Sequence, residues 1–399
     1  MKLFFLVLWN LILINASAQR SCLTYITEKP AGSEIASLSM NGRDTMPNEV
    51  IVIPVVIHIL YSDPSQNLSD EQVRSQLVVL NNDFRKRNLD VSEIPFPFIN
   101  IAADARITFC IARVDPVGRP TSGIIHKHTN VQAWTADDAM KFSASSGDDA
   151  WDAKRYLNIW VCSLFGRNLG YASLPGGVAI KDGVVIQYGV FGTLGSVAPF
   201  DKGRTATHEI GHWLGLKHLW GDADCGDDGI ADTPPQKTYN NGCPTFPHTS
   251  SCSINLNGDM FMNYMDFSND GCMHMFTRGQ VSVMRSLFSA GGQRNSFLIS
   301  NVCDSIRAQG APVPADTLLN IQGYVIYPNP ASAYINISTN VQILHSIPYI
   351  VYNVLGKSLV SSVLSSQKSI LSLKGFVAGM YIIRIGEGKN VISLPFMKE

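Results

Sequence analysis

The spacing of three histidines constrains this chain more than any other feature. His208 and His212 are four residues apart, so on a helix they share one face and both imidazoles can reach one metal ion. Gly215 allows the sharp backbone turn where a helix must stop, and His218 can then return as a third nitrogen ligand. The pattern predicts a helix over Thr205–Leu219 that carries metal ligands.

The residues within this pattern indicate what the metal would do. Three neutral imidazoles leave the fourth position of a tetrahedral site open, which is typical of a catalytic zinc ion and not of a closed structural one. Glu209 follows the first histidine and is placed to act as the general base. The alternative is a set of ordinary helix histidines, but five fixed positions match by chance in roughly one such chain in 10⁵.

The stretch HEIGHWLGLKH at 208–218 resembles the zinc motif of the metzincin metallopeptidases. Metzincins also have a methionine turn beneath the metal, and Met265 in NYMD is similar to it. Over about residues 50–290, the stretches IPVVIHILY, LNIWVC, DTPPQ and MNYMDFSNDGCMHMFTRGQ resemble the pappalysin family, which includes cytophagalysin- and ulilysin-like enzymes. The resemblance implies a zinc endopeptidase with an α+β fold: a twisted mixed sheet, a backing helix, an active-site helix and an irregular lower subdomain across a cleft.

One residue departs from the family pattern. The second residue after the turn methionine is usually a tyrosine whose hydroxyl steadies the zinc and the oxyanion, and here it is Phe267. Zinc and backbone donors would then stabilise the oxyanion, or another group such as Tyr264 would. Phe267 also motivates a different hypothesis, a binding module on a metallopeptidase scaffold, against which the intact Glu209 and histidines argue. A zinc hydrolase of non-peptide substrates is a third hypothesis, which the family resemblance disfavours.

An acidic loop follows the zinc motif. Residues 222–232 hold five carboxylates, which repel one another unless a hard cation with oxygen ligands orders the loop. A solvated acidic loop is the alternative. Structural calcium lies here in the pappalysin family, so the resemblance implies Ca²⁺ bound by Asp228, Asp232 and Thr233.

The N-terminus indicates export. A lysine, an apolar run over 3–14 and Ala16-Ser17-Ala18 are the three parts of a secretory signal peptide, predicted over residues 1–18. About a dozen apolar residues are too few for the alternative, a membrane anchor. Residues 19–49 are interpreted as a pro-segment. With 31 basic and 32 acidic residues the chain lacks the charge excess of a nucleic-acid binder, and no later segment is apolar enough to span a membrane.

Export makes disulfides possible, although cysteine spacing does not give their pairing. The family resemblance implies Cys225–Cys243 and Cys252–Cys272, of which the second would tie the methionine turn to the preceding loop.

The other cysteines have different predicted roles. Cys110 and Cys162 lie in strand-like runs and are predicted to be buried free thiols. Cys22 stands in Arg20-Ser21-Cys22, and some latent relatives use an R-x-C thiolate of the pro-segment as a fourth zinc ligand. A disulfide, for example with Cys303, or an idle thiol are the alternatives. The latency hypothesis predicts that removing residues up to about 43–48 activates the enzyme.

Substrate preference depends on one acidic residue. Relatives often cut before Arg or Lys with a carboxylate at the base of the S1′ pocket, and Asp270, just past the methionine turn, is the candidate. Loop capping or a plain surface charge are the alternatives. Arg43 in the pro-segment would then be a point of self-cleavage.

Hydrophobic patterning predicts the elements around these motifs, within a catalytic domain over residues 50–305. Runs rich in β-branched residues predict strands, and helical spacing predicts a helix that Ser69 caps and a second helix over Thr277–Phe288. The predicted strands are 50–61, 106–114, 156–164 and 183–188.

A Pro/Ala-rich linker over 306–320 precedes residues 321–399, whose short strands and turns predict a small all-β sandwich. Within it, YPNP, YNVLGK and GMYIIRI resemble the sorting domain of type IX secretion. The resemblance implies this secretion machinery as a partner, transport through the periplasm and outer membrane, and a secreted or surface-attached product. A carbohydrate- or protein-binding sandwich is the alternative, but no aromatic platform favours it.

Overall fold

The computed structural model describes residues 20–24, 49–252 and 257–303, and in the C-terminal part 319–321, 324–327, 331–339, 346–353, 357–366, 368–386 and 392–398. The chain divides into two compact units, Met1–Arg307 and Ala308–Glu399. The predicted signal peptide, most of the predicted pro-segment and most of the predicted linker lie outside the described residues.

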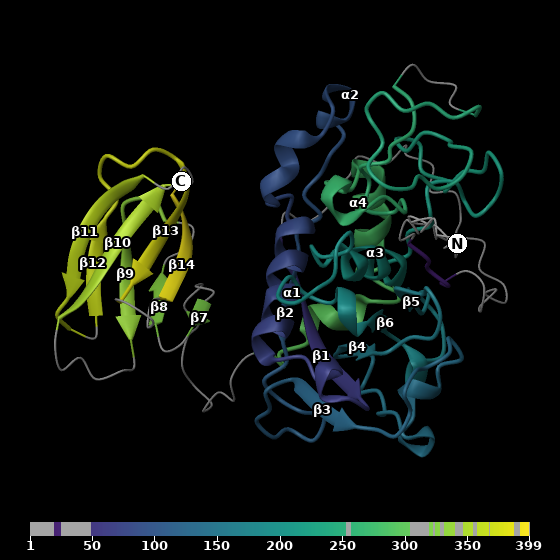
Figure 1. The fold of residues 1–399 in the computed structure, drawn as a ribbon, viewed down its shortest axis with the longest axis horizontal. Coiled ribbons are helices and arrows are strands. Elements are labelled where there is room, and N and C mark those ends of the chain that lie inside the picture. The colour runs from purple at the N-terminus through teal and green to yellow at the C-terminus, as the bar shows by residue number, and fades with distance from the viewer. Residues whose placement is uncertain are drawn as a thin grey trace, which may run out of the picture. The chain divides into compact units, whose positions relative to one another are not determined.

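A six-stranded mixed sheet underlies the first unit (Figure 1). Its centre is β1, the apolar run Ile51–Tyr61, which pairs in parallel with β2, β3 and β4, and β6 continues the sheet in parallel. The last strand, β5, pairs antiparallel with β6 and forms an edge. The other bounds are Ile107–Ile111 (β2), Ile124–His128 (β3), Leu157–Cys162 (β4), Gly170–Ala172 (β5) and Val184–Gln187 (β6). All four predicted strand regions are confirmed, whereas β3 and β5 were not predicted.

Two helices pack against one face of this sheet, α1 (Asp70–Asp83) and α3 (Arg204–Trp213). The Ser69 hydroxyl caps α1 as predicted, accepting from the Gln72 N–H. Every residue of α3 is buried. The helix ends at Trp213, before the predicted end at Leu219, and Gly215 at φ +86° makes the predicted turn. Two more α-helices, α2 (Phe96–Ile99) and α4 (Arg278–Ser286), follow in the chain, with short 3-10 helices at Pro64–Gln66, Leu89–Glu93, Ala139–Lys141, Ser143–Ser145, Ala179–Lys181, Tyr188–Val190, Asp270–Cys272 and Asn295–Ile299.

Residues 220–275 form an irregular region, which lies with α4 on the side of α3 away from the sheet (Figure 1). Its disulfides differ from the prediction: Cys225 pairs with Cys252, and Cys243 pairs with Cys272. The backbone path explains the correction. Asn269 N–H bonds to the Gly242 carbonyl at 2.8 Å, which brings the two chain segments around Cys243 and Cys272 together.

A third disulfide corrects another prediction. Cys110 is not a free thiol, since it pairs with Cys303 and ties β2 to the end of the first unit. This pairing also rules out Cys303 as the partner of Cys22. Cys162, on β4, is a buried free thiol as predicted.

The second unit is an all-β sandwich of two four-stranded antiparallel sheets, ordered β11-β10-β13-β14 and β12-β9-β8-β7. Alternating apolar residues of both sheets, such as Ile337 and Ile383, meet in one core. The bounds are Leu319–Ile321 (β7), Tyr324–Tyr327 (β8), Tyr334–Thr339 (β9), Ile347–Asn353 (β10), Ser358–Leu364 (β11), Lys368–Ser372 (β12), Gly379–Ile385 (β13) and Ile392–Lys398 (β14). Within the described parts of the chain, no helix has the length and apolarity to cross a membrane.

Candidate metal centre and substrate site

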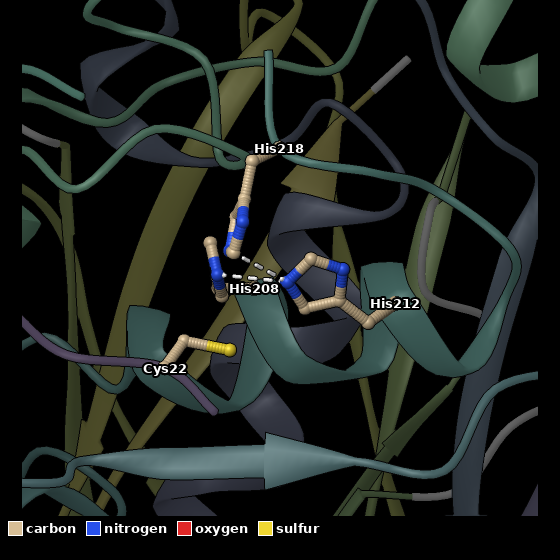
Figure 2. Close-up of side chains that lie close together, drawn as sticks. All are labelled: Cys22, His208, His212 and His218. Carbon is tan, nitrogen blue, oxygen red and sulfur yellow. Dashed lines mark hydrogen bonds between the residues drawn. The ribbon is translucent and has the colours of Figure 1, made fainter. Parts of the chain in front are cut away.

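Three buried histidines converge on one point (Figure 2). The Nε2 atom of His212 lies 3.1 Å from Nε2 of His208 and 3.0 Å from Nε2 of His218. Helix α3 supplies the first two residues one turn apart, and the turn at Gly215 returns the third. The structure thus brings the three predicted ligands together.

The hydrogen bonds of the outer nitrogens of His208 and His212 are consistent with a cation between the rings. His208 Nδ1 lies 2.7 Å from the Tyr264 carbonyl, His212 Nδ1 lies 2.8 Å from the Leu216 carbonyl, and both carbonyls can only accept. Burial, followed by the neighbouring histidines, lowers the pKa of His208 and His212 well below the ordinary value, so these rings are neutral. Each Nε2 therefore directs a lone pair at the others, an arrangement that a bound metal ion stabilises.

The third ring is oriented by a carboxylate. His218 Nδ1 is hydrogen-bonded to Asp222 Oδ1, and the indole of Trp220 stacks on the imidazole with ring centroids 4.5 Å apart. A metal-ligating histidine that donates its second N–H to a carboxylate is a common arrangement at zinc sites. The donor set is therefore the one that zinc prefers.

Met265 packs against α3, the helix that carries two of the histidines, in agreement with the expected methionine turn. It is completely buried, and a Cβ built on Gly211 of α3 would lie 2.5 Å from the methionine sulfur. Any larger residue at position 211 would therefore displace the Met265 side chain. Phe267 packs against His208 and His218 with centroid distances of 5.6 and 4.9 Å, so it completes an apolar wall and offers no hydroxyl.

Tyr264 does not have the geometry of an oxyanion donor. Its ring is completely buried, packs on Phe276 with centroids 4.8 Å apart, and lies 5.7 Å from the guanidinium carbon of Arg204. The backbone carbonyl, and not the hydroxyl, is the part of Tyr264 that reaches a metal ligand. The candidate role is corrected accordingly.

Glu209 faces residues 20–24, which belong to the predicted pro-segment. Its Oε2 accepts from the Cys22 thiol at 3.3 Å and from the Thr24 hydroxyl at 3.2 Å. On its other side a Cβ on Gly170 would come within 2.9 Å of Glu209 Cγ, so the edge strand β5 lies directly against this side chain. Burial raises the pKa of Glu209 to about 8, which is the range that suits a proton acceptor near neutral pH.

Residues 20–24 lie along the edge of the sheet beside the histidines. Cys22 forms a parallel bridge with Gly170, and the Leu169 N–H bonds to the Ser21 carbonyl at 3.1 Å. The Cys22 sulfur and the three histidine nitrogens all lie within 4.8 Å of one another. Burial raises the pKa of this thiol well above its usual value, so only a cation beside it would favour the thiolate.

Asp270 is buried and holds the side chain of Arg20. Its Oδ1 is paired with Arg20 Nη2, while its Oδ2 accepts from the backbone N–H groups of Lys202 and Arg204 at 2.9 and 3.1 Å. The last two donors surround the start of α3, where a negative charge is favoured. A plain surface charge is therefore excluded, and capping and cation binding occur together.

The acidic loop brings two of the three predicted calcium ligands, Asp228 and Thr233, into contact. Asp228 is buried, its Oδ1 accepts from Thr233 Oγ1 at 2.7 Å, and its Oδ2 has no partner among the described residues, as a carboxylate awaiting a cation would. Asp232 fits less well, because its two oxygens accept from Thr277 Oγ1 and Gly279 N at the start of α4.

Several site residues were missed by sequence reasoning. Arg20 and Thr24 flank the predicted thiol, and Asp222 stands four residues after His218, so all three positions carried a local signal. Thr205 and Phe200, which contact the Arg20 guanidinium, carried none, since only the folded chain brings them to Asp270.

Three convergent histidines, two of them on the buried helix α3, a glutamate on the same helix and a methionine turn packed against it define a metalloendopeptidase of the metzincin class. The chain belongs to the metallopeptidase family described as pregnancy-associated plasma protein-A, which matches residues 142–289. Residues 325–399 match the secretion system C-terminal sorting domain, so the product is secreted or attached to the cell surface.

Relatives and solved structures agree with this assignment. The chain is 31% identical to extracellular metalloprotease 1 of Coccidioides posadasii over 272 residues, which is 65% of this chain and 84% of that protein. It is 37% identical to an extracellular metalloprotease of Podospora anserina, covering 65% of this chain and 80% of the relative. The structure of mirolysin in complex with compound 9 has 50% identity and a TM-score of 0.62, covering 63% of this chain and 97% of that one. A mutant of Tannerella forsythia promirolysin has 49% identity and a TM-score of 0.62, covering 63% and 85%.

Proposed function

We propose that this metalloendopeptidase is made as a latent precursor in which residues 20–24 block the active site, and that Glu209 is its general base. The observation that carries the proposal is the contact of Cys22 and Thr24 with Glu209, beside three histidine lone pairs. His208, His212 and His218 would hold one Zn²⁺. A bound zinc ion supplies Lewis acidity, which brings the pKa of water toward about 7 and polarises a carbonyl.

The protein's own part in hydrolysis centres on Glu209. Once the pro-segment leaves, Oε2 loses the donors Cys22 and Thr24 and can accept a proton from the attacking water. The same carboxyl group can then protonate the leaving amine. The edge strand still lies against Glu209 Cγ at Gly170 after the pro-segment leaves, which shields that side of the carboxyl group from bulk water.

Latency follows from how completely the pro-segment occupies this site. The Thr24 hydroxyl accepts from the Ala172 N–H of the edge strand at 3.0 Å, and the Cys22 thiol can serve as a fourth metal ligand. A substrate backbone that needs the same edge is excluded. One solved relative is titled promirolysin, which supports a pro-form in this family.

Preference for a basic P1′ residue is supported by Arg20. Asp270 is completely buried, and without Arg20 its Oδ1 would face the site with no cationic partner, which is costly for a carboxylate. A substrate Arg or Lys would supply that partner. The proposed self-cleavage before Arg43 concerns a residue outside the described ranges.

A structural Ca²⁺ at Asp228 and Thr233 completes the proposal. The partnerless Asp228 Oδ2 supports it, together with the Thr233 hydroxyl oxygen at the same carboxylate. The bonds that Asp232 makes to α4 argue for a capping role for that residue instead.

The test compares activated wild type with Glu209→Gln on a denatured protein substrate, with and without a zinc chelator. We expect Glu209→Gln to lose activity by about 10²–10⁴-fold while it retains zinc, because only the proton acceptor is removed. The exposed Glu71→Gln serves as the matched control and should cleave normally. Equal cleavage by wild type and Glu209→Gln, unaffected by the chelator, would contradict the proposal.

A further inference from the structure

Asp182 is a buried carboxylate that joins three separate parts of the first unit. Its Oδ1 accepts from the Trp213 indole Nε1 at 2.6 Å and from the Ser173 hydroxyl at 3.2 Å, and both of its oxygens are paired with the Arg294 guanidinium. Trp213 is the last residue of α3, Ser173 follows the edge strand β5, and Arg294 lies beyond α4. One carboxylate therefore contacts the helix of the metal ligands, the end of the edge strand and the C-terminal part of the unit.

The backbone around Asp182 is fixed to the sheet. Gly183, the next residue, precedes β6, and its carbonyl accepts from the Ser173 N–H at 2.9 Å while its own N–H donates to the Ser173 hydroxyl at 2.8 Å. Gly183 has φ +145°, and a Cβ at this position would collide with the carbonyl of Asn158 on β4. The carboxylate is therefore held by the strands β4, β5 and β6.

The other side of the contact ends beside a metal ligand. Trp213 follows His212 directly, and its buried ring stacks on Arg294, whose guanidinium carbon lies 3.8 Å from the ring centre. Arg294 Nη2 also lies 3.4 Å from the Trp213 carbonyl, at the C-terminal end of α3, where a positive charge is favoured. A shift of Trp213 relative to the sheet would move His212 with it.

These contacts are directional, whereas the apolar packing between α3 and the sheet is not. Ala206 and Ile210 of α3 belong to the main hydrophobic core, and apolar contact by itself does not fix one position of a helix on a sheet. A buried ion pair also adds little stability over well-packed apolar side chains. The position that these bonds fix is therefore a more important effect of Asp182 than the stability that they add.

We propose that Asp182 is a positioning residue that sets the distance between the metal ligands and the edge strand that binds the substrate backbone. The inference rests on the proposed function, in which residues 20–24 and a substrate use the same edge. Gly170 of this strand lies against Glu209, so a displacement of β5 changes where a bound peptide stands relative to the metal and the proton acceptor. Misplacement by about 1 Å can cost about 10²-fold in rate.

The experiment uses the activated, zinc-loaded enzyme and three probes. Acetohydroxamate can bind only the metal, a non-cleavable peptide can bind only the strand, and the same peptide ending in a hydroxamate must bind both. Trp213→Phe removes the indole donor, and Ser173→Ala removes the hydroxyl. Each variant should weaken the peptide hydroxamate about tenfold and leave the affinities of the other two probes unchanged. Each should also lower kcat about tenfold with KM unchanged.

Asp148→Asn is the matched control. Asp148 pairs with the buried His58 of β1 and with Lys127 of β3, and it contacts neither Trp213 nor Ser173 among the printed bonds of its side chain. This variant should lower Tm without changing the affinity of any probe. In an Asp182→Asn background, Trp213→Phe should have little further effect, because the contact that it removes is already gone.

The outcomes distinguish the inference from the function on which it rests. A wild type that binds the peptide hydroxamate no more tightly than acetohydroxamate overturns the proposed use of the edge strand, and this inference with it. A wild type that gains affinity from the peptide, but keeps the same gain in Trp213→Phe and Ser173→Ala, overturns this inference alone. Equal weakening of all three probes would also overturn it, because a general loss of structure would then explain the data.

The full-length precursor provides a readout that needs no inhibitor. Residues 20–24 bond to the edge at the Ala172 N–H and reach Glu209 on α3, so they also depend on the distance between strand and helix. Ser173→Ala should therefore speed activation of the full chain about threefold, whereas Asp148→Asn should not. Equal acceleration by both variants would contradict the positioning role.

Discussion

The metal centre and the irregular region 220–275 are neighbours in sequence but are stabilised in different ways. At the metal centre a buried helix carries His208 and His212, and backbone carbonyls fix both rings. The irregular region has long stretches without helix or strand and is closed by two disulfides. Its buried Asp228 oxygen has no partner among the described residues.

This difference separates two ways of building a functional site. The ligands on α3 are preorganised by secondary structure and core packing, so zinc is needed for chemistry more than for shape. The loops after His218 gain order from cross-links and, in our proposal, from an ion. Asp270 belongs to these loops by its place beside Cys272, and its N–H bonds to the Pro199 carbonyl before α3. In our proposal, substrate preference therefore depends on the less regular region.

The largest expected effect comes from opening a cross-link of the irregular region. Replacing Cys243 and Cys272 by serine should lower the free energy of unfolding by about 3 kcal/mol, raise KM for basic peptides and expose residues 243–272 to proteolytic nicking. The matched control replaces Cys110 and Cys303, which join the sheet region. That variant should lose stability without local nicking or a change in KM, and equal nicking of both variants would break the comparison.

The next effect concerns calcium and pH. Burial raises the pKa of Asp228 to about 7, whereas an unfolded aspartate titrates near about 4. Without calcium, the folded chain holds a proton between these values that the unfolded chain has lost, so stability falls as pH rises through this window. Calcium needs the ionised carboxylate, so its stabilising shift of Tm should be larger at about pH 8 than at about pH 5.5.

Two variants sharpen this measurement. Asp228→Asn should remove the calcium-dependent shift of Tm at either pH, whereas the exposed Asp224→Asn should retain it. A calcium shift that is independent of pH, or that survives in Asp228→Asn, would place the ion elsewhere.

The smallest effect tests a contact on the metal-centre side. Thr24→Val removes the hydroxyl that donates to Glu209 and accepts from Ala172 N. We expect the full chain to activate about fivefold faster, because one hydrogen bond to a buried carboxylate is lost. Ser21→Ala, at a partly buried position that contacts Asn168, is the control and should activate at the wild-type rate.

The features that could be predicted from sequence are those that local geometry determines. The spacing of His208 and His212, the turn at Gly215 and the cap at Ser69 each depend on a few consecutive residues, and the structure agrees with all of them. Long runs of β-branched residues predicted strands correctly for the same reason.

The predictions that were wrong concern features that depend on the path of the chain through space. Cysteine pairing in 220–275 is set by which loops meet, as the bond between Asn269 and Gly242 shows, and no periodicity encodes it. Tyr264 was a candidate because it is next to Met265, yet successive residues of a turn point in different directions, and its ring enters the core. Residues such as Thr205 are brought to the site only by folding.

The central claim, latency through Cys22 at the metal, can be measured directly by replacing zinc with Co²⁺ in the full-length precursor. A cobalt–thiolate bond gives a charge-transfer absorption band that nitrogen and oxygen ligands do not. We predict this band in the wild-type precursor, its loss after removal of the pro-segment, and its absence from Cys22→Ser, which should also activate faster than wild type because one of the contacts of residues 20–24 is lost. A Cys22→Ser precursor that activates at the wild-type rate, with the same cobalt spectrum as wild type, would contradict the account.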